Sequence, residues 1–127
     1  MKQLACALFA LVASAAAVHA GARYTNGVSV NTTSRSGGGP LAAARADGST
    51  HTNIQIEAYG TNSYVGAYVL ITDPAGVFAY CWTNNPGLTQ LLAAASNDAQ
   101  VFVYWDTTGQ CTNVYVTNDS GLAPKAP

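Results

Sequence analysis

Charged residues are scarce in this chain. Lysine, arginine, aspartate and glutamate together account for only 9% of its 127 residues, and the formal net charge is −1. Proteins that bind nucleic acid or an anionic membrane surface present a basic face, so we expect neither partner here. The surface must instead be built from Thr, Asn, Ser, Gly and the seven tyrosines. Such a neutral, polar and aromatic surface suits sugars or proteins as ligands.

The N-terminal segment has the composition of a secretory signal peptide. Lys2 precedes an apolar run over residues 4–18. Residues 18–20 then have the pattern of small or apolar residues after which a signal peptidase cleaves. The run is shorter than the roughly 20 apolar residues of a membrane-spanning helix. We therefore predict that residues 1–20 are removed, that the protein is secreted into the periplasm or the extracellular space, and that no membrane span remains.

Few cysteines and histidines are left after this cleavage. Cys6 leaves with the signal peptide, so the secreted chain keeps Cys81, Cys111 and His51. In an oxidising compartment the two cysteines are expected to form one disulfide. A zinc site needs three or four His, Cys or carboxylate ligands, so we expect neither a bound metal nor a cofactor.

The sequence also lacks the usual catalytic motifs. A Ser-His-Asp arrangement would have to use His51, and there is no G-x-S-x-G elbow. The glycines at 37–39 are not followed by the Lys and Ser or Thr of a phosphate-binding loop. Glu57 could form a glycosidase-like pair with Asp73 or Asp106, but both aspartates lie beside turn residues, where Asp is ordinarily structural. We expect no enzymatic activity.

Alternation of apolar and polar residues predicts most of the chain to be β-structure. The predicted strands cover residues 28–33, 54–59, 64–72, 77–82, 101–105 and 114–116. The stretch from Ser34 to Ser49 is rich in Gly, Ala and Ser, and we interpret it as a long mobile loop. The last residues, 121–127, are predicted to form a frayed tail.

One short helix is predicted between the fourth and fifth strands. Asn85 followed by Pro86 is a favourable helix start, because Asn can cap the first turn and Pro tolerates its first position. An apolar stripe at helical spacing follows, made by Leu88, Leu91, Leu92 and Ala95. The predicted fold is therefore mainly β, a single domain over residues 21–120 that forms a small antiparallel OB-like barrel with one disulfide.

Part of the chain resembles a known family. The segments Val77–Trp82, Asn85–Leu92 and Gln100–Tyr104 resemble the receptor-binding B subunits of bacterial AB5 toxins, nearest to the subtilase cytotoxin branch, and related small secreted bacterial proteins. The resemblance covers roughly residues 77–117 and includes no catalytic signature. It implies an OB-like fold, assembly into a ring of five, and glycan binding on exposed strand and loop edges.

A sugar-binding site is the function that the residues themselves favour. Sugars have apolar C–H faces ringed by hydroxyls, so aromatic rings stack on the faces while Asn, Asp, Gln and Ser read the hydroxyls. The candidate residues lie around a turn and at the exit of another strand: Tyr59, Asn62, Ser63, Tyr64, Trp82, Asn84 and Asn85. Strand aromatics are also enriched for packing alone, so core or cross-strand pairing is the alternative for each of them.

The competing hypothesis is a secreted protein-interaction or assembly subunit, such as an inhibitor, without a sugar site. A glycan-binding protein should group exposed Tyr and Trp with Asn or Asp around a shallow pocket. An interaction subunit should instead show a continuous apolar patch or an exposed strand edge.

Overall fold

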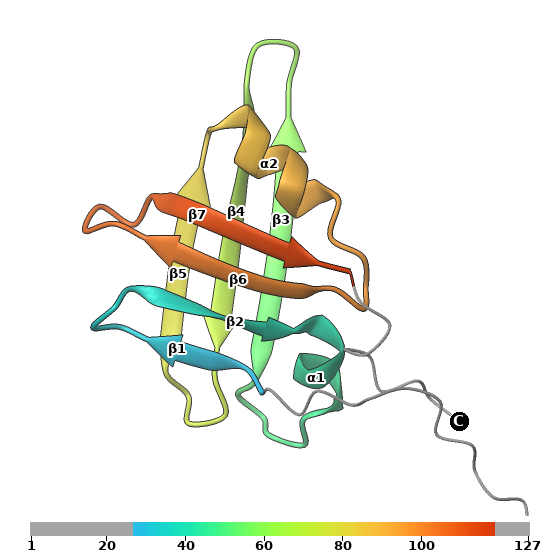
Figure 1. Cartoon of the computed structure of the whole chain (residues 1–127), viewed down its shortest axis with the longest axis vertical. Coiled ribbons are helices and arrows are strands. Elements are labelled where there is room, and N and C mark those ends of the chain that lie inside the picture. The colour runs from blue at the N-terminus through green and yellow to red at the C-terminus, as the bar shows by residue number, and fades with distance from the viewer. Residues whose placement is uncertain (1–26, 119–127) are drawn as a thin grey trace, which may run out of the picture.

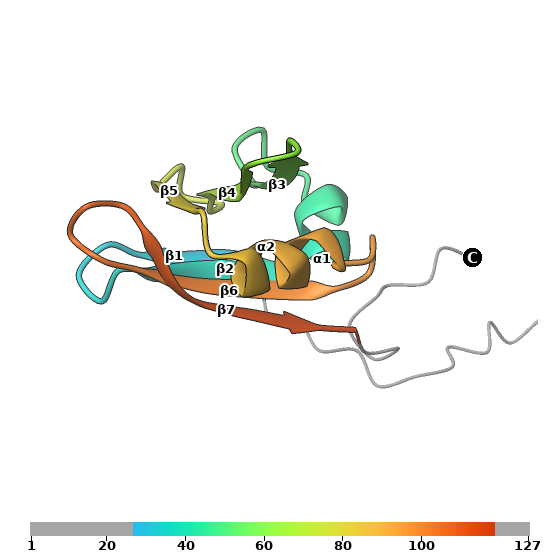
Figure 2. The same cartoon turned by 90° about the horizontal axis from the view of Figure 1, so that it is seen from above.

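Two antiparallel sheets lie face to face and make up most of the structure (Figures 1 and 2). The computed structural model describes residues 27–118. Sheet A has the strand order β1-β2-β6-β7 and sheet B the order β3-β4-β5. The elements are β1 (Ser29–Asn31), β2 (Ser36–Pro40), α1 (Leu41–Ala46), β3 (Asn53–Gly60), β4 (Val65–Thr72), β5 (Phe78–Thr83), α2 (Pro86–Ala93), β6 (Gln100–Trp105) and β7 (Cys111–Thr117).

The strands of the two sheets run across one another, and the helices lie beside the sheets (Figures 1 and 2). The mainly β prediction is confirmed, but a closed barrel is not, because the two sheets remain open. The predicted signal peptide (1–20) and tail (121–127) lie outside the described residues. Among residues 27–118, no helix has both the length and the apolar character needed to cross a membrane.

The core lies between the two sheets. On β4, the inward residues Ala67, Val69 and Ile71 are fully buried, as the alternation of this strand predicts. They meet inward residues of the opposite sheet and of α2, namely Val101, Val103, Val114 and Leu92. The outward side chains of β4 are only half-buried, so the prediction that this strand is buried on both sides holds for one face alone.

The Gly-rich segment is a buried strand, so the prediction of a long mobile loop over residues 34–49 is wrong. β2 pairs with β1 on one side and β6 on the other, and all five of its residues are buried. Glycine is required here, since a Cβ atom on Gly38 would lie 2.0 Å from the carbonyl oxygen of Val101. The chain then forms α1, in which Ala42 is buried. As a result α2 lies between the fifth and sixth strands rather than the fourth and fifth.

The helix α2 begins as predicted. The Asn85 side-chain oxygen accepts hydrogen bonds from the backbone N–H groups of Gly87 (2.9 Å) and Leu88 (3.2 Å). The predicted apolar stripe is only partly correct, because Leu92 is buried whereas Leu91 is 46% exposed. Thr89, rather than Leu91, is the second buried residue of this helix.

The Asn85 cap gives a stability prediction. Asn85→Ala should lower the free energy of unfolding by about 1 kcal/mol, because two N–H groups of the first turn lose their acceptor. Asn84→Ala is the matched control, since Asn84 is exposed and adjacent, and it should change stability by less than about 0.5 kcal/mol. Urea unfolding followed by circular dichroism measures both. Equal losses in the two variants would contradict the capping role.

The predicted disulfide is present and joins the two sheets. Cys81 lies on β5 of sheet B and Cys111 on β7 of sheet A, with their Cα atoms 5.1 Å apart. Beside it, the Trp82 N–H donates a hydrogen bond of 3.1 Å to the Gly109 carbonyl. The disulfide therefore fastens β5 to the β6–β7 hairpin.

Candidate functional site

The outer face of sheet B, on the side away from the core, carries a group of aromatic side chains. We call this surface the sheet B face. It consists of the outward residues of three strands and the β3–β4 turn: Glu57, Tyr59, Asn62, Tyr64, Tyr68, Phe78, Tyr80 and Trp82. Tyr59, Tyr64 and Tyr80 are each exposed over more than two fifths of their surface. These rings are accessible to a ligand.

The period of the β-strand places these residues together. Tyr80 and Trp82 alternate with the buried Ala79 and Cys81, so both point to the outer side of β5. Cross-strand register continues the row, since Trp82 pairs with Tyr68 of β4 and Tyr68 pairs with Glu57 of β3. The sheet B face therefore extends over all three strands.

Ring spacing is similar in two tyrosine pairs of the sheet B face, one at the β3–β4 turn and one in the middle of the sheet. The centroids of Tyr59 and Tyr64 are 6.0 Å apart, and those of Tyr68 and Tyr80 are 6.2 Å apart. Tyr59 lies over Gly66, where a Cβ atom would come within 2.8 Å of its ring. The absence of a side chain at Gly66 lets the ring lie against the sheet.

Hydrogen bonds hold the tyrosine hydroxyls in their protonated form. The Tyr68 hydroxyl donates to the Glu57 carboxylate, and this bond, followed by desolvation, raises the pKa of Tyr68. A hydrogen bond with Tyr64 is the main cause that raises the pKa of Tyr59. At neutral pH these phenols are uncharged and can act as hydrogen-bond donors.

The structure brings most of the sequence-predicted site residues to one end of sheet B. Tyr59, Asn62, Ser63 and Tyr64 lie at or beside the β3–β4 turn, and β5 ends at the same end of the sheet. Asn84 is exposed just beyond β5. The Asn85 side-chain oxygen is committed to the α2 cap, which leaves its amide N–H group for a ligand.

Sequence reasoning missed three aromatic members of this face, and Glu57 as well. Tyr68, Phe78 and Tyr80 were not predicted site residues, although period-two alternation on β4 and β5 places them beside Trp82. The signal was present in the sequence. Which face of each strand stays open to solvent depends on where sheet A packs.

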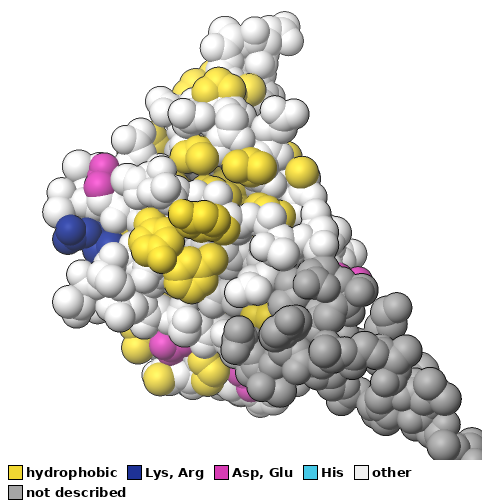
Figure 3. Space-filling model, in the orientation of Figure 1, with side chains coloured by type: hydrophobic (Ala, Val, Ile, Leu, Met, Phe, Trp, Pro, Cys, Tyr) yellow, Lys and Arg dark blue, Asp and Glu magenta, His cyan; other side chains and the backbone are white. Residues whose placement is uncertain are grey.

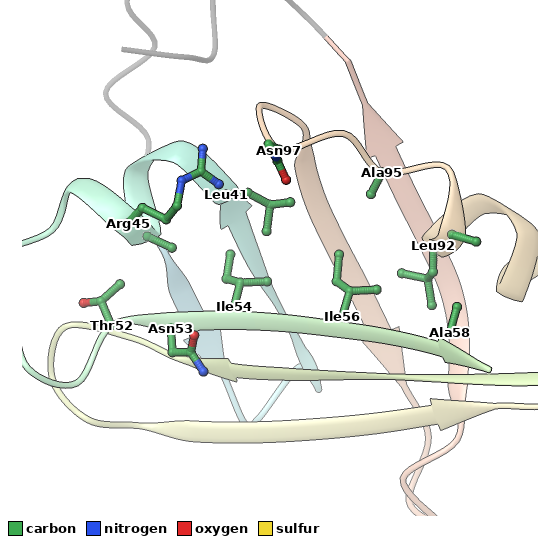
Figure 4. A pocket seen from close by; sticks show the side chains of 12 residues that line it. Leu41, Arg45, Thr52, Asn53, Ile54, Ile56, Ala58, Leu92, Ala95 and Asn97 are labelled. Carbon is green, nitrogen blue, oxygen red and sulfur yellow. The ribbon is translucent and has the colours of Figure 1, made fainter. Parts of the chain in front are cut away.

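A groove of about 690 Å³ lies on the other side of sheet B, at its β3 edge. Figure 4 shows Ile54, Ile56 and Ala58 of β3 facing residues of α1 and of the α2–β6 connection. Apolar side chains line the groove at β3 and at the two helices, where Leu41 and Leu92 lie, while polar groups make up much of its exposed lining, with side chains of Arg45, Thr52, Asn53 and Asn97 around it. The groove contains none of the predicted site residues.

The groove exists because sheet A does not seal the edge of sheet B. Ile71 and Val69 of β4 are 1% and 0% exposed, yet their cross-strand partners Ile54 and Ile56 on β3 are only half-buried. β3 is also an edge strand, paired on one side only. Every second N–H and C=O along its eight residues therefore points away from β4.

Acidic side chains in the described residues serve mainly structural roles. The Asp73 carboxylate accepts the backbone N–H groups of Ala75 and Val77, and Asp106 accepts those of Thr108 and Gln110. The Thr108 hydroxyl also donates a hydrogen bond to the Asp106 carboxylate, and this bond is the main cause that lowers the pKa of Asp106. Within residues 27–118, no group of three or more His, Cys, Asp or Glu side chains is placed to hold a metal ion.

Comparison with known proteins adds no relative to this picture. No family model, curated protein or solved structure matches the chain. A function can therefore be inferred only from the surfaces of the described residues.

Proposed function

We propose that this protein is a secreted, non-enzymatic glycan-binding protein, and that the sheet B face is its binding surface. The observation that supports this most directly is the group of exposed rings, Tyr59, Tyr64 and Tyr80, with the half-buried Tyr68 and Trp82 beside them. Exposed aromatic side chains are costly to leave in water, and they offer flat apolar surfaces with a polar edge. Sugar C–H faces match such surfaces.

The shape of the sheet B face favours a linear glycan chain. The rings do not surround the groove, which lies on the opposite side of sheet B, so they differ from the pocket arrangement expected from the sequence and lie instead on the sheet surface. The ring spacing of about 6 Å is comparable with the distance between successive pyranose rings in a linear glycan. A chain can therefore stack on several rings at once.

Polar groups around the rings suit neutral sugars. Glu57 offers carboxylate oxygens to sugar hydroxyls, and Asn62 and Asn84 add amide groups at the end of the face. A carboxylate at the binding surface disfavours anionic glycans, as does the negative net charge of the chain. The proposed ligand class is therefore a neutral oligosaccharide or polysaccharide.

The resemblance of residues 77–117 to AB5 toxin B subunits implies glycan binding in general and does not specify neutral glycans. On that basis we propose an OB-like relationship for the fold and assembly into a ring of five. A ring with several sites facing one surface would gain on the order of 10² to 10⁴ in avidity over a single site. Light scattering of the purified protein measures whether the ring forms.

A second candidate function is a protein-interaction subunit that binds through β3. The free edge of β3 and the groove beside it are the observations that favour it. An added strand would gain main-chain hydrogen bonds, and its alternate side chains would enter the groove.

The test is a glycan array followed by binding measurements on variants of the sheet B face. Tyr64→Ala combined with Tyr80→Ala should weaken binding to the best array ligand at least tenfold, because two stacking surfaces are lost. Leu91→Ala is the control, since Leu91 is similarly exposed but lies on α2. Its affinity should equal that of the unmodified protein.

Two outcomes would contradict the proposal. A clean array from a well-folded protein would rule out the glycan function and direct attention to the β3 edge. Glycan binding that the Tyr64 and Tyr80 substitutions leave unchanged would show that the sheet B face is not the binding surface.

A further inference from the structure

A second group of aromatic side chains, two of them exposed and one half-buried, lies on the outer face of sheet A. It consists of Phe102 and Tyr104 on β6 and Tyr115 on β7, and we call it the sheet A face. Figure 3 looks directly at this surface and shows hydrophobic side chains gathered in its middle. Because the two sheets lie face to face, the sheet A face and the sheet B face point in opposite directions (Figure 2).

The geometry of this group repeats that of the sheet B face. The centroids of Phe102 and Tyr104 are 5.5 Å apart, and those of Tyr104 and Tyr115 are 6.1 Å apart. Tyr104 is 40% and Tyr115 is 56% exposed. The exposed rings therefore again lie at the spacing that suits successive sugar rings.

The strand residues around these rings are polar and uncharged, but Arg35 and Asp106 lie at the neighbouring turns, just before Ser36 of β2 and just after β6. Figure 3 shows charged side chains of both signs near the hydrophobic group. Asn113 pairs with Tyr104 across β6 and β7, and Gln100 pairs with Thr117 in the row beyond Phe102. None of the outward-facing described residues of sheet A is charged: Ser29, Asn31, Ser36, Gln100, Phe102, Tyr104, Asn113, Tyr115 and Thr117. The surface offers amides, hydroxyls and rings, which are the groups that a neutral sugar needs.

The size of the sheet A face argues against a second protein as its occupant. Three half-exposed aromatic side chains offer roughly 300 Å², given about 150–250 Å² for each side chain. A stable protein–protein interface needs about 800 Å² from each partner. The strand surface itself carries no charged side chain to bind an ionic ligand, and the two charges at the neighbouring turns, Arg35 and Asp106, are of opposite sign. A short stretch of neutral glycan fits both limits.

We infer that the sheet A face is a second glycan-binding site, so that one copy of this protein can hold two glycan chains on opposite sides. The inference rests on the proposed function for its ligand class but uses different residues. Phe102, Tyr104 and Tyr115 stack on sugar rings, and Asn113 reads their hydroxyls. A single folded domain then cross-links polysaccharide chains without first forming an oligomer.

The experiment is an NMR titration of the ¹⁵N-labelled purified protein with linear neutral oligosaccharides of the cello-, xylo-, chito-, laminari- and malto-series. Two separate groups of amide signals should shift, one from β3, β4 and β5 and the other from β6 and β7. Tyr104→Ala combined with Tyr115→Ala should remove only the second group. Tyr64→Ala combined with Tyr80→Ala should remove only the first, and calorimetry should change from two bound ligands to one in either case.

The remaining outcomes distinguish failure of the second site on sheet A from failure of the proposed site on sheet B. Shifts confined to β3, β4 and β5 would overturn the second site and leave the proposed function intact. Shifts confined to β6 and β7 would overturn the sheet B face as the binding surface, and with it the two-sided cross-linking. No shift with any of these oligosaccharides at millimolar concentration would overturn both.

Two controls keep the result interpretable. The amide spectrum of each double variant must retain the dispersion of a folded protein. If one does not, Tyr115→Ser replaces the Tyr104 and Tyr115 variant, and Tyr80→Ser replaces the Tyr64 and Tyr80 variant. Light scattering tests whether a second copy of the protein covers the sheet A face instead of a glycan. A dimer that becomes a monomer when Tyr104 and Tyr115 are replaced would overturn the inference, because the face would then be an interface between two copies.

Discussion

Replacing Cys81 and Cys111 with serine is expected to lower the free energy of unfolding by about 3 to 4 kcal/mol. The disulfide spans 30 residues, and in the loop-entropy model a cross-link of this size restricts the unfolded chain by about that amount. Small domains are stable by only about 5–15 kcal/mol, so the loss is a large part of the total. Urea unfolding at neutral pH measures it.

A second pair of variants separates the cross-link from the chemistry of the new side chains. Both cysteines are almost fully buried, so serine also places two hydroxyl groups in an apolar setting, which costs free energy when they find no partner. Alanine at both positions removes the disulfide without these hydroxyls and should be less destabilising than serine. A loss below about 1 kcal/mol in the alanine variant would contradict the stabilising role of the disulfide.

Replacing Gly38 with alanine is expected to destabilise the protein by about 4 kcal/mol or prevent folding. Two costs combine, each of about 1–3 kcal/mol: a φ of +150° that side chains rarely adopt, and overpacking. The new Cβ atom would clash with two backbone atoms of β6, because it would lie 2.0 Å from the Val101 carbonyl oxygen and 2.6 Å from the Phe102 Cα. Backbone of a paired strand cannot move aside as a flexible side chain can.

A series of glycine variants makes this prediction testable even when one of them does not fold. A Cβ atom on Gly39 would lie 2.9 Å from the Val28 Cα, whereas one on Gly48 would meet nothing within 4 Å. Stability should therefore decrease in the order Gly48→Ala, Gly39→Ala, Gly38→Ala. Thermal unfolding by circular dichroism ranks them. A Gly38→Ala variant as stable as Gly48→Ala would show that β2 does not have the described pairing.

Sequence periodicity predicted the elements whose side chains carry a hydrophobic signal. β3, β4, β5, β6 and α2 lie within a few residues of their predicted ranges, because apolar residues alternate along the strands and repeat at helical spacing along the helix. β2 was missed because glycine has no side chain to contribute to such a pattern. Its burial depends on backbones approaching closely, which only the paired strands reveal.

The candidate site residues also divide into those that a local sequence pattern indicates and those that only the packing of the sheets reveals. Tyr59, Tyr64 and Trp82 were predicted because they lie at a turn and at a strand end. Tyr80 lies two residues before Trp82 on the same face of β5, so alternation alone could have predicted it. The groove beside β3 could not be predicted, because it results from how far sheet A extends over sheet B rather than from any local sequence pattern.

The unpaired edge of β3 also has a consequence for how the protein behaves in concentrated solution. Natural edge strands are commonly protected against self-association by proline, lysine or a bulge. β3 has eight residues in continuous register with β4, contains neither proline nor lysine, and carries one charged residue, Glu57. Glu57 is therefore the only charge that β3 itself opposes to strand-to-strand aggregation along this edge, so an otherwise folded protein at high concentration would associate through β3.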